Sequence, residues 1–423
     1  MNLYCDEKWV GTLRPSGNVW RLEFAQRPAV PLSPHLVGKK DTLIETQAVQ
    51  DFFVNYLPEE PFAERVAARL KPRPRSLEDW FVALGQELTG AYALTPGDVG
   101  LAGVEYLDLP EKVLIESMQN SRSRADAFAF TVNQQSTLPR LSLAGAQDKF
   151  ALWFDPKATG GSTHFKIPQG RAASTHIFKP ESTDARYPLL PANEYACSRL
   201  ARAMGLPVAH SVLMNLGGVR TLISERFDRQ RRGAQVKRLH QIDLCQMLGL
   251  PRERKYGSHN AGVDTEHFFE GCRYLNVPAI ARRDHLRAWL FNFLIGNQDA
   301  HAKNYSFLYR DGWQTAPLYD LLCVVPYLPD QSLTMGLLNE YRPGWFERKH
   351  WLSLAHLAGV TSCYLAREIG NMVQAAEAVS KPLAKTLRSH LINDELDFLA
   401  ERVNPVIVER AKYLREAAAG LSA

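Results

Sequence analysis

Apolar residues recur at helical spacing between Arg282 and Ile295. The positions that follow the i, i+3, i+4, i+7, i+8 pattern are Leu286, Trp289, Leu290, Phe293 and Leu294. Phe291 and Ile295 extend the apolar surface to nearly all sides, which predicts a buried helix. The polar stretch 296–304 (GNQDAHAKN) follows this helix directly, so its side chains are expected to rest on a rigid base.

Residues 1–105 are expected to form a module of their own. Two apolar stretches flank a turn and predict a β-hairpin with strands in 1–13 and 18–24. Residues 46–70 predict two helices, interrupted by Pro58 and Pro61. A capping-box pattern of Ser76 and Asp79 starts a further helix that is expected to end near Gly90. Nothing in this module resembles a catalytic site, and its role is expected to be structural or partner-facing.

Residues 106–226 are expected to form a β-rich lobe after a polar connector at 106–137. The predicted elements are strands at 150–154, 163–167 and 175–179, a helix at 193–204, and strands at 208–216 and 219–227. Three strands, a helix and two strands, with Lys179 on the third strand, follow the plan of a protein-kinase N-lobe, in which that lysine pairs with nucleotide phosphates. Glu194 near the start of the helix is a candidate to steady this lysine, and an ordinary surface glutamate is the alternative.

Residues 227–423 are mostly helical in pattern, with predicted helices at 239–248, 282–295 and within 350–423. The predicted fold is therefore α+β: a protein-kinase-like two-lobed fold with a β-rich N-lobe, a mostly helical C-lobe and an extra N-terminal α/β module. The expected domains are 1–105, 106–226 and 227–423.

Two short patterns point to phosphoryl transfer. Asp299 and Asn304 have the D-x-x-x-x-N spacing of a kinase catalytic loop, and a predicted hairpin over 305–319 leads to Asp320. A carboxylate facing the attacking hydroxyl and two oxygen ligands for Mg²⁺ are what this chemistry needs. Small residues at 144–146 before Lys149 would let a backbone turn approach a phosphate, although an ordinary loop-to-strand junction has the same pattern.

Composition narrows the class of protein. The 423 residues are 45% hydrophobic and 22% charged with a net charge of +5, which fits a globular protein of two or three domains and is too mild to indicate nucleic-acid binding. Basic clusters at 71–75 and 226–238 are interpreted as solvated faces or linkers. Six cysteines are spread singly, which argues against a zinc site or a disulfide framework. No signal peptide or membrane span is evident, so a cytoplasmic location is expected.

Seven blocks in order resemble the HipA family of bacterial toxin serine/threonine kinases, and the match spans nearly the whole chain. The blocks are SLAGAQDK (142–149), STHIFK (174–179), NEYAC (193–197), SERFDR (224–229), LHQIDLCQ (239–246), GNQDAHAKN (296–304) and PLYD (317–320). The N-terminal module also resembles the N-terminal domain of that family.

The resemblance implies a role for each matching position. Asp299 would be the catalytic base, with His301 supporting its turn, and Asn304 and Asp320 would bind Mg²⁺. The residues implied to contact ATP are Lys179, Lys149 with the loop of Ala144, Gly145, Ala146 and Gln147, and the adenine-binding hinge of Glu225, Arg226 and Phe227. Ser142 matches the serine whose autophosphorylation silences family members.

The resemblance also implies a biological role. The chain would be the ATP- and Mg²⁺-dependent kinase toxin of a type II toxin–antitoxin system that phosphorylates an aminoacyl-tRNA synthetase, inhibits translation and arrests growth. Its expected partners are a HipB-like helix-turn-helix antitoxin and, through that complex only, DNA. No membrane partner is expected.

Two positions depart from the family pattern. Ala300 stands where glycine is usual, and Ile242 stands where an acidic residue often follows the glutamine. Two other functions stay open at this point. The chain could be a non-catalytic scaffold or corepressor in a DNA-bound complex, or a kinase of small molecules with the same Asp/Asn/Asp layout.

Overall fold

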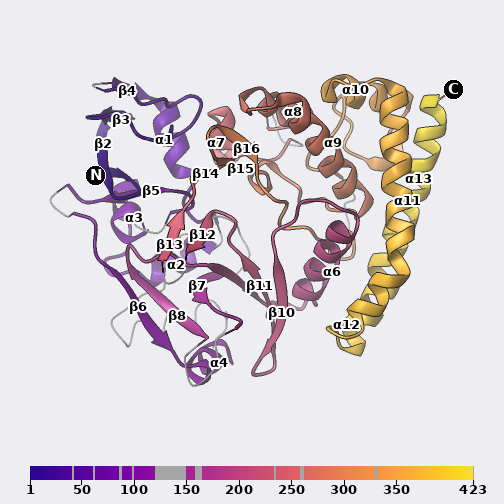
Figure 1. Ribbon diagram of the computed structural model, residues 1–423, viewed down its shortest axis with the longest axis horizontal. Coiled ribbons are helices and arrows are strands. Elements are labelled where there is room, and N and C mark those ends of the chain that lie inside the picture. Colours follow the sequence, from indigo (N-terminus) through magenta and orange to yellow (C-terminus); the bar gives the residue numbers. More distant parts are fainter. Residues whose placement is uncertain are drawn as a thin grey trace. The chain divides into compact units, whose positions relative to one another are not determined.

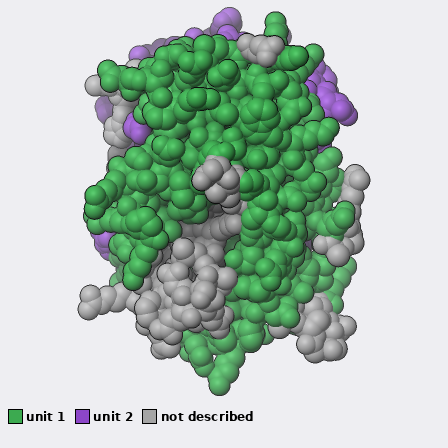
Figure 2. Space-filling model, turned by 90° about the vertical axis from the view of Figure 1, so that its left-hand side faces the viewer, with its two compact units in different colours: residues 1–185, 214–242, 249–252 green, residues 186–213, 243–248, 253–423 purple. Residues whose placement is uncertain are grey.

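A computed structural model describes residues 1–40, 42–60, 62–84, 88–97, 100–119, 149–157, 164–232, 235–257, 262–328 and 332–422 (Figure 1). The chain forms two compact units (Figure 2). The first unit consists of Met1–Ala185, Met214–Ile242 and Gly249–Arg252, and the second of Arg186–Leu213, Asp243–Leu248 and Glu253–Ala423. Sheets and helices are both present, as the predicted α+β class requires. The predicted division at residues 105 and 226 stays a prediction.

The first unit begins with a five-stranded sheet in the order β4-β3-β2-β1-β5. Its strands are β1 (Asn2–Cys5), β2 (Lys8–Ser16), β3 (Val19–Phe24), β4 (Thr42–Thr46) and β5 (Tyr92–Thr95). Burial alternates along β3 with the two-residue period of a strand that has one face in the core. The predicted hairpin is confirmed as β2–β3. The first predicted strand, residues 1–13, is divided into β1 and β2 at Asp6, which has a φ of 54°.

Three helices accompany this sheet: α1 (Gln47–Val54), α2 (Phe62–Arg69) and α3 (Leu77–Leu84). The predicted break between the first two is confirmed. The capping box is also present, because Ser76 Oγ accepts the Asp79 amide at 3.1 Å and Asp79 Oδ2 accepts the Ser76 amide at 3.0 Å. α3 is described over Leu77–Leu84, and residues 85–87 lie outside the described residues, so the predicted end near Gly90 stays a prediction.

A six-stranded sheet follows, in the order β10-β11-β9-β7-β8-β6. Its strands are β6 (Val104–Leu109), β7 (Phe150–Phe154), β8 (Phe165–Gly170), β9 (His176–Pro180), β10 (Ser211–Leu216) and β11 (Val219–Glu225). The predicted strands of this region are confirmed. The prediction of a polar connector at 106–137 is wrong for its first part, because β6 pairs with β8 and α4 (Glu111–Gln119) buries Leu114 and Met118. Those two residues are one helical turn apart, a signal too short to stand out in a polar segment.

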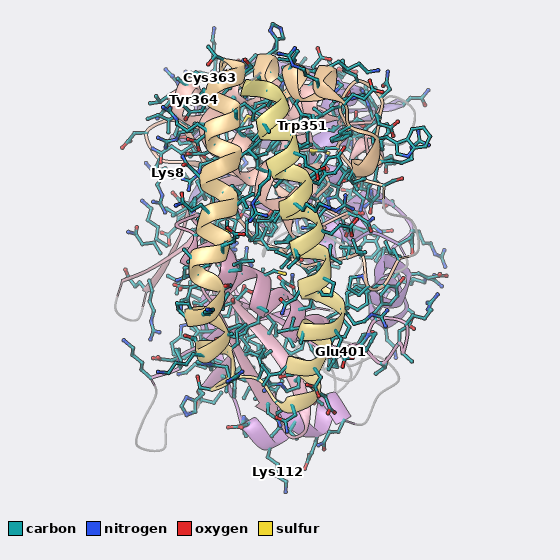
Figure 3. All side chains as sticks on the ribbon, turned by 90° about the vertical axis from the view of Figure 1, so that its right-hand side faces the viewer. Lys8, Lys112, Trp351, Cys363, Tyr364 and Glu401 are labelled. Atoms are coloured by element: carbon teal, nitrogen blue, oxygen red, sulfur yellow. The ribbon has the colours of Figure 1, made fainter. Side chains whose placement is uncertain are left out.

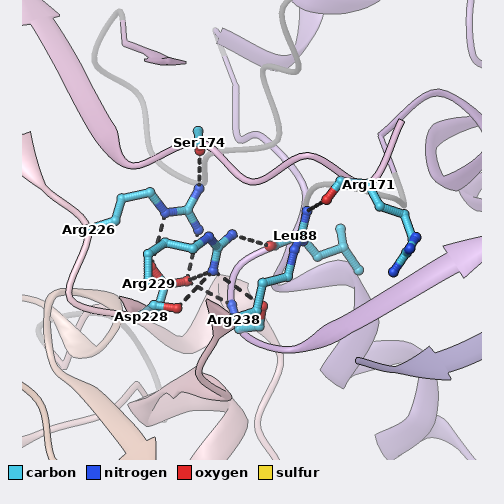
Figure 4. A network of polar contacts seen from close by, with 8 residues as sticks. Leu88, Arg171, Ser174, Arg226, Asp228, Arg229 and Arg238 are labelled. Carbon is cyan, nitrogen blue, oxygen red and sulfur yellow. Dashed lines mark hydrogen bonds and ion pairs between the residues drawn. The ribbon is translucent and has the colours of Figure 1, made fainter. Parts of the chain in front are cut away.

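A buried ion-pair network joins the two sheets of the first unit (Figure 4). Arg226 and Arg229 both contact Asp228, at 2.8 and 2.6 Å, and Arg226 Nη1 also donates to Ser174 Oγ at 2.9 Å. The Gly90 amide donates to Asp228 Oδ2 at 2.9 Å. Burial alone would raise the pKa of Asp228, but the two guanidinium groups outweigh it and hold that pKa far below its usual range. The N-terminal module is thereby tied to the segment that follows β11.

The basic hairpin of β12 (Arg229–Arg232) and β13 (Gln235–Arg238) was not predicted. It is followed by β14 (Gln241–Asp243) and α7 (Leu244–Leu248), so the predicted helix over 239–248 is wrong in its first half. Ile242 is buried in β14, a position where an apolar side chain needs no polar partner.

The second unit is mainly helical. Its longer helices are α6 (Leu190–Ala203), α8 (Thr265–Glu270), α9 (Pro278–Leu294), α10 (Arg348–Ala358), α11 (Ser362–Leu387), α12 (Asn393–Phe398) and α13 (Asn404–Ser422). The predicted hairpin after the polar stretch is confirmed as β15 (Ser306–Tyr309) and β16 (Trp313–Thr315). No helix in the described ranges is long and apolar enough to span a membrane.

The second unit packs around α9, whose C-terminal half is buried on all sides as predicted. An aromatic cluster covers it, in which Trp289 and Phe293 contact Phe346 and Trp351. α11 and α13 pack along each other at the outside, with Trp351 beneath them and Tyr364 near the start of α11 (Figure 3). This packing supports the polar segment 296–304, which follows α9.

Candidate active site

The polar segment after α9 forms a closed turn around Asp299. The Asn304 side-chain Nδ2 donates to the Asp299 carbonyl at 2.8 Å, and the His301 amide donates to the same oxygen at 2.8 Å. The Asp299 amide in turn donates to Asn297 Oδ1 at 3.2 Å. Both backbone groups of Asp299 are therefore fixed by the segment itself, and the carboxylate is carried by a rigid turn.

Gly296 lets the chain leave α9 in the direction of this turn. Its φ is +67°, and a Cβ there would lie 2.8 Å from Val406 Cγ1 and 2.9 Å from Val325 Cγ2. A larger residue would be strained and would also clash with both neighbours. The Gly296 carbonyl accepts the Val324 amide at 3.0 Å, so this position also contacts the segment that follows Asp320.

Tyr256 and His301 lie against the base. The Tyr256 hydroxyl is 3.3 Å from Asp299 Oδ1, and its ring meets the His301 ring edge to face at 5.1 Å. Lys255 places its ammonium group 4.8 Å from the centre of the Tyr256 ring, and its carbonyl accepts the Ala302 amide at 3.1 Å. The predicted supporting position of His301 agrees with this packing, although its role in catalysis stays a prediction.

Asp320 follows in a segment that is tied back to the turn. Tyr319 donates from its hydroxyl to the Lys303 carbonyl at 2.7 Å, and Asn297 Nδ2 donates to the Asp320 carbonyl at 3.1 Å. Leu318 bonds on both sides to the chain after α6, since its amide donates to Pro207 and its carbonyl accepts from Ala209. Asp320 itself has a φ of 58°, a left-handed conformation that costs on the order of 1 kcal/mol in a residue with a Cβ.

Asn304 and Asp320 fit the ligand set of a magnesium site. The amide nitrogen of Asn304 is committed to Asp299, so its oxygen is the atom that remains for a cation. The described residues contain no group of three or more His, Cys, Asp or Glu side chains that could hold a metal. Mg²⁺ commonly binds through one or two protein oxygens together with substrate phosphates, which is the donor set that these two residues offer.

Lys303 anchors the turn from the other side. Its Nζ lies 2.6 Å from Asp243 Oδ2, and both side chains are buried. Asp243 Oδ1 also accepts the Gln246 amide at 2.9 Å and so caps α7. A lysine held this tightly by a carboxylate is a structural anchor.

The first unit carries the residues that were predicted to bind nucleotide. Lys179 lies on β9, opposite Leu222 of β11, and is 6% exposed, while Lys149 directly precedes β7 and is 9% exposed. Lysines are seldom this buried. Glu225, at the end of β11, is exposed, and Phe227 is half-buried. Their contacts with ATP stay predictions.

Arg226 has its polar groups engaged within the protein. Its amide donates to the Thr175 carbonyl at 2.9 Å, its carbonyl accepts the Arg229 amide at 3.2 Å, and its guanidinium group belongs to the Asp228 network. The side chain therefore supports the segment after β11. Ser142, Ala144, Gly145, Ala146 and Gln147 lie outside the described residues.

Two further predicted features can be placed in the second unit. Glu194 is buried in α6 and is 5% exposed, so the alternative of an ordinary surface glutamate is wrong. Ala300 is buried beside the base and is not one of the described non-glycine residues with positive φ. Alanine is therefore accommodated at 300 without backbone strain.

Comparison with known proteins decides the family. A model of the HipA-like C-terminal domain matches residues 141–380, and a model of the HipA N-terminal domain matches residues 1–95. The chain belongs to the HipA family. Y4mE of Sinorhizobium fredii, whose name assigns it provisionally to the kinases, is 33% identical over 398 residues, which cover 91% of this chain and 90% of that protein.

A second HipA relative is the serine/threonine-protein kinase toxin HipA of Shewanella oneidensis, which is 29% identical over 92% of this chain and 89% of that protein. The structure of the Shewanella oneidensis HipA, HipB and operator DNA complex contains a chain that matches with a TM-score of 0.81 and 26% identity over 99% of both chains. The α+β fold of HipA, with its kinase-like lobes, is therefore the fold of this chain.

Sequence reasoning did not single out Asn297 and Tyr256. Asn297 lies in the block 296–304, in which other residues were assigned roles. Its side chain offers both a donor and an acceptor, and this could have indicated a structural role. Tyr256 is separated from Asp299 by 43 positions, and nothing in the HipA-like blocks indicates that the two meet.

Proposed function

We propose that this chain is an ATP-dependent protein serine/threonine kinase that acts in the cytoplasm as the toxin of a HipB-like antitoxin pair. The observation that carries the proposal is the Asp299 turn, in which a carboxylate is held rigidly five residues before an Asn whose amide oxygen is left for a cation. A relative of similar length is named a serine/threonine-protein kinase toxin, which supports the same conclusion.

The base in this mechanism is Asp299. Its carboxylate would accept the proton of the substrate serine hydroxyl as that oxygen attacks the terminal phosphorus of ATP, the bond from this phosphorus to the bridging oxygen breaks and ADP leaves. Tyr256 bonds to one carboxylate oxygen, which leaves the other to face the hydroxyl. A carboxylate whose backbone and side chain are both fixed loses little entropy when it meets the substrate.

Asn304 and Asp320 would hold Mg²⁺, which supplies positive charge against the phosphates when bound. In the first unit, Lys179 and Lys149 would bind phosphate oxygens, with the loop of Ala144, Gly145, Ala146 and Gln147 beside them. The hinge of Glu225, Arg226 and Phe227 would hydrogen-bond adenine through its main chain, while the Arg226 side chain stays in its network with Asp228.

The proposed substrate is an aminoacyl-tRNA synthetase, and Ser142 is the proposed site of inactivating autophosphorylation. The proposed antitoxin is a helix-turn-helix protein, through which the complex would reach DNA. The structural relative is a HipA, HipB and operator DNA complex, which supports this partner.

The test is Mg²⁺-ATP phosphotransfer by the purified full chain, alone and with a panel of aminoacyl-tRNA synthetases, followed by intact mass and peptide mapping. Phosphate on Ser142 and on one synthetase is the expected result. Absence of transfer would contradict the kinase, and absence of Mg²⁺-dependent thermal stabilisation by ATP as well would favour a scaffold subunit. Transfer to small hydroxyl compounds alone would identify a small-molecule kinase.

A further inference from the structure

Asn297 connects the two halves of the proposed catalytic centre. Its Oδ1 accepts the Asp299 amide at 3.2 Å, and its Nδ2 donates to the Asp320 carbonyl at 3.1 Å and to Asn292 Oδ1 at 2.8 Å. Its own amide donates to the Asn292 carbonyl at 2.9 Å. The side chain is 3% exposed, so these bonds are shielded from water. One amide therefore contacts the main chain of both the base and a metal-ligand candidate.

The orientation of this amide is forced by its partners. A backbone N–H can only donate and a backbone carbonyl can only accept, so the oxygen of Asn297 must face Asp299 and its nitrogen must face Asp320. Asn292 is oriented by the same logic, because its Nδ2 donates to the Ala288 carbonyl at 3.0 Å and to the Tyr305 hydroxyl at 3.0 Å. The oxygen of Asn292 is thereby directed to Asn297. The whole chain of amides has one arrangement.

The bond to Asp320 falls at a residue with an unfavourable backbone conformation. Asp320 adopts a left-handed φ of 58°, and the bond from Asn297 to its carbonyl helps to hold that conformation. Loss of this bond would remove one restraint on the Asp320 main chain, and its carboxylate would move relative to Asp299. The Asp299 turn keeps its own bonds to Asn304 and His301. A substitution that removes the Nδ2 donor of Asn297 should therefore displace Asp320 before it affects Asp299.

We propose that Asn297 is a positioning residue that sets the placement of Asp320 relative to Asp299, and through it the Mg²⁺ requirement of the protein. This inference rests on the proposed function, because it takes Asn304 and Asp320 as the Mg²⁺ ligands. Outer partners that orient the ligands of a metal commonly contribute a substantial part of its affinity. Asn297 has this relationship to Asp320.

The decisive variant is Asn297→Asp. Its carboxylate can still accept the Asp299 amide, but it cannot donate to the Asp320 carbonyl or to Asn292, and it places a negative oxygen against both acceptors. Asn297→Ala removes all three side-chain bonds. Tyr305→Phe is the matched control, because it removes the hydroxyl that Asn292 bonds and leaves the bonds of Asn297 in place.

Two readouts are needed on the full chain: ATP-induced thermal stabilisation as a function of Mg²⁺ concentration, and phosphotransfer rate over the same range. For Asn297→Asp we expect the Mg²⁺ half-saturation to rise about tenfold in both, with ATP binding in the absence of metal unchanged. Asn297→Ala should show the same shift and a lower kcat. Tyr305→Phe should lose stability without a shift in Mg²⁺ dependence.

An unchanged Mg²⁺ half-saturation in Asn297→Asp, or an equal shift in Tyr305→Phe, would overturn the positioning role and leave the kinase proposal intact. If the wild type transfers no phosphate yet shows Mg²⁺-dependent stabilisation by ATP, the kinase proposal fails, and Asn297 is judged by the thermal readout alone. A wild type whose ATP binding does not respond to Mg²⁺ overturns both.

Discussion

The hydroxyl of Tyr256 donates to Oδ1 of Asp299 at 3.3 Å, so the proposed base is held by a side chain that comes from a distant part of the second unit. A hydrogen bond to one carboxylate oxygen fixes the rotation of the group and leaves the other oxygen for the substrate. Tyr256 also supports the ring of His301. These two contacts can be separated by mutation.

Tyr256→Phe removes the hydroxyl and keeps the ring. We expect kcat for phosphotransfer to fall about tenfold, the effect of losing one hydrogen bond to a charged group, with the KM for ATP nearly unchanged. Tyr256→Ala should lose more, because the His301 contact disappears as well. Steady-state kinetics on the three proteins measure both effects. A wild-type kcat in Tyr256→Phe would show that the hydroxyl does not orient the base.

The Lys303–Asp243 ion pair should contribute stability only as a pair. Lys303→Met leaves the Asp243 carboxylate buried without its counter-charge, and Asp243→Asn takes the carboxylate away from the buried Lys303 ammonium group. Each change is expected to lower the free energy of unfolding by about 3–5 kcal/mol, and the double variant should recover most of that loss. Urea unfolding of the four proteins tests the coupling. Additive losses in the double variant would contradict it.

Buried histidines should make the protein less stable in mild acid. Burial lowers the pKa of His285 and of His240 from 6.5 to about 4 in each case. The unfolded chain therefore binds more protons than the folded chain between those pH values, and stability falls as the pH drops from about 6.5 toward 4. At pH 5 each histidine should account for about 2 kcal/mol of this loss.

His285→Asn isolates one of the two contributions. The asparagine amide can still donate toward the Ala281 carbonyl, which His285 Nδ1 contacts at 2.9 Å, but it does not titrate. Between pH 7 and pH 5 the free energy of unfolding of the variant should therefore fall by about 2 kcal/mol less than that of the wild type. Urea unfolding at the two pH values gives the comparison. Equal slopes would show that His285 does not titrate as its burial requires.

The parts of the fold that the sequence could predict are those with strong local patterns. α9 has an apolar period that no other element type explains, and Ser76 with Asp79 is a local cap whose two bonds are present as expected. The β15–β16 hairpin is likewise indicated by its turn residues, Asp311 and Gly312, which both have positive φ in the structure.

The predictions of secondary structure that were wrong concern segments whose structure depends on tertiary contacts. Residues 106–109 were predicted as part of a polar connector, yet they belong to the strand Val104–Leu109, because it pairs with Phe165–Gly170 at the edge of a sheet. Gln241–Asp243 was predicted as helix because its apolar neighbours fit helical spacing, yet the helix begins only at Leu244, where Asp243 caps it.

The candidate site also contains residues that local sequence predicts and residues that depend on long-range contacts. Asp299 and Asn304 are neighbours in sequence, so their spacing alone predicts a turn that joins them. Asn297 and Tyr256 act through long-range contacts, to Asp320 and Asp299 respectively, and only the folded chain brings those groups together. The engagement of Arg226 with Asp228 could not be read from the sequence either, because it depends on the buried environment that Ser174 and Gly90 complete.

The measurement that tests the central claim most directly is phosphotransfer from Mg²⁺-ATP by the wild type and by Asp299→Asn, side by side. The substitution keeps the shape of the side chain and removes the base. We expect phosphate on the wild type or its protein substrate by intact mass, a rate at least about 10²- to 10⁴-fold lower in the variant, and equal thermal stabilisation of both by Mg²⁺-ATP. Transfer by Asp299→Asn at the wild-type rate would contradict the assignment of Asp299 as the catalytic base.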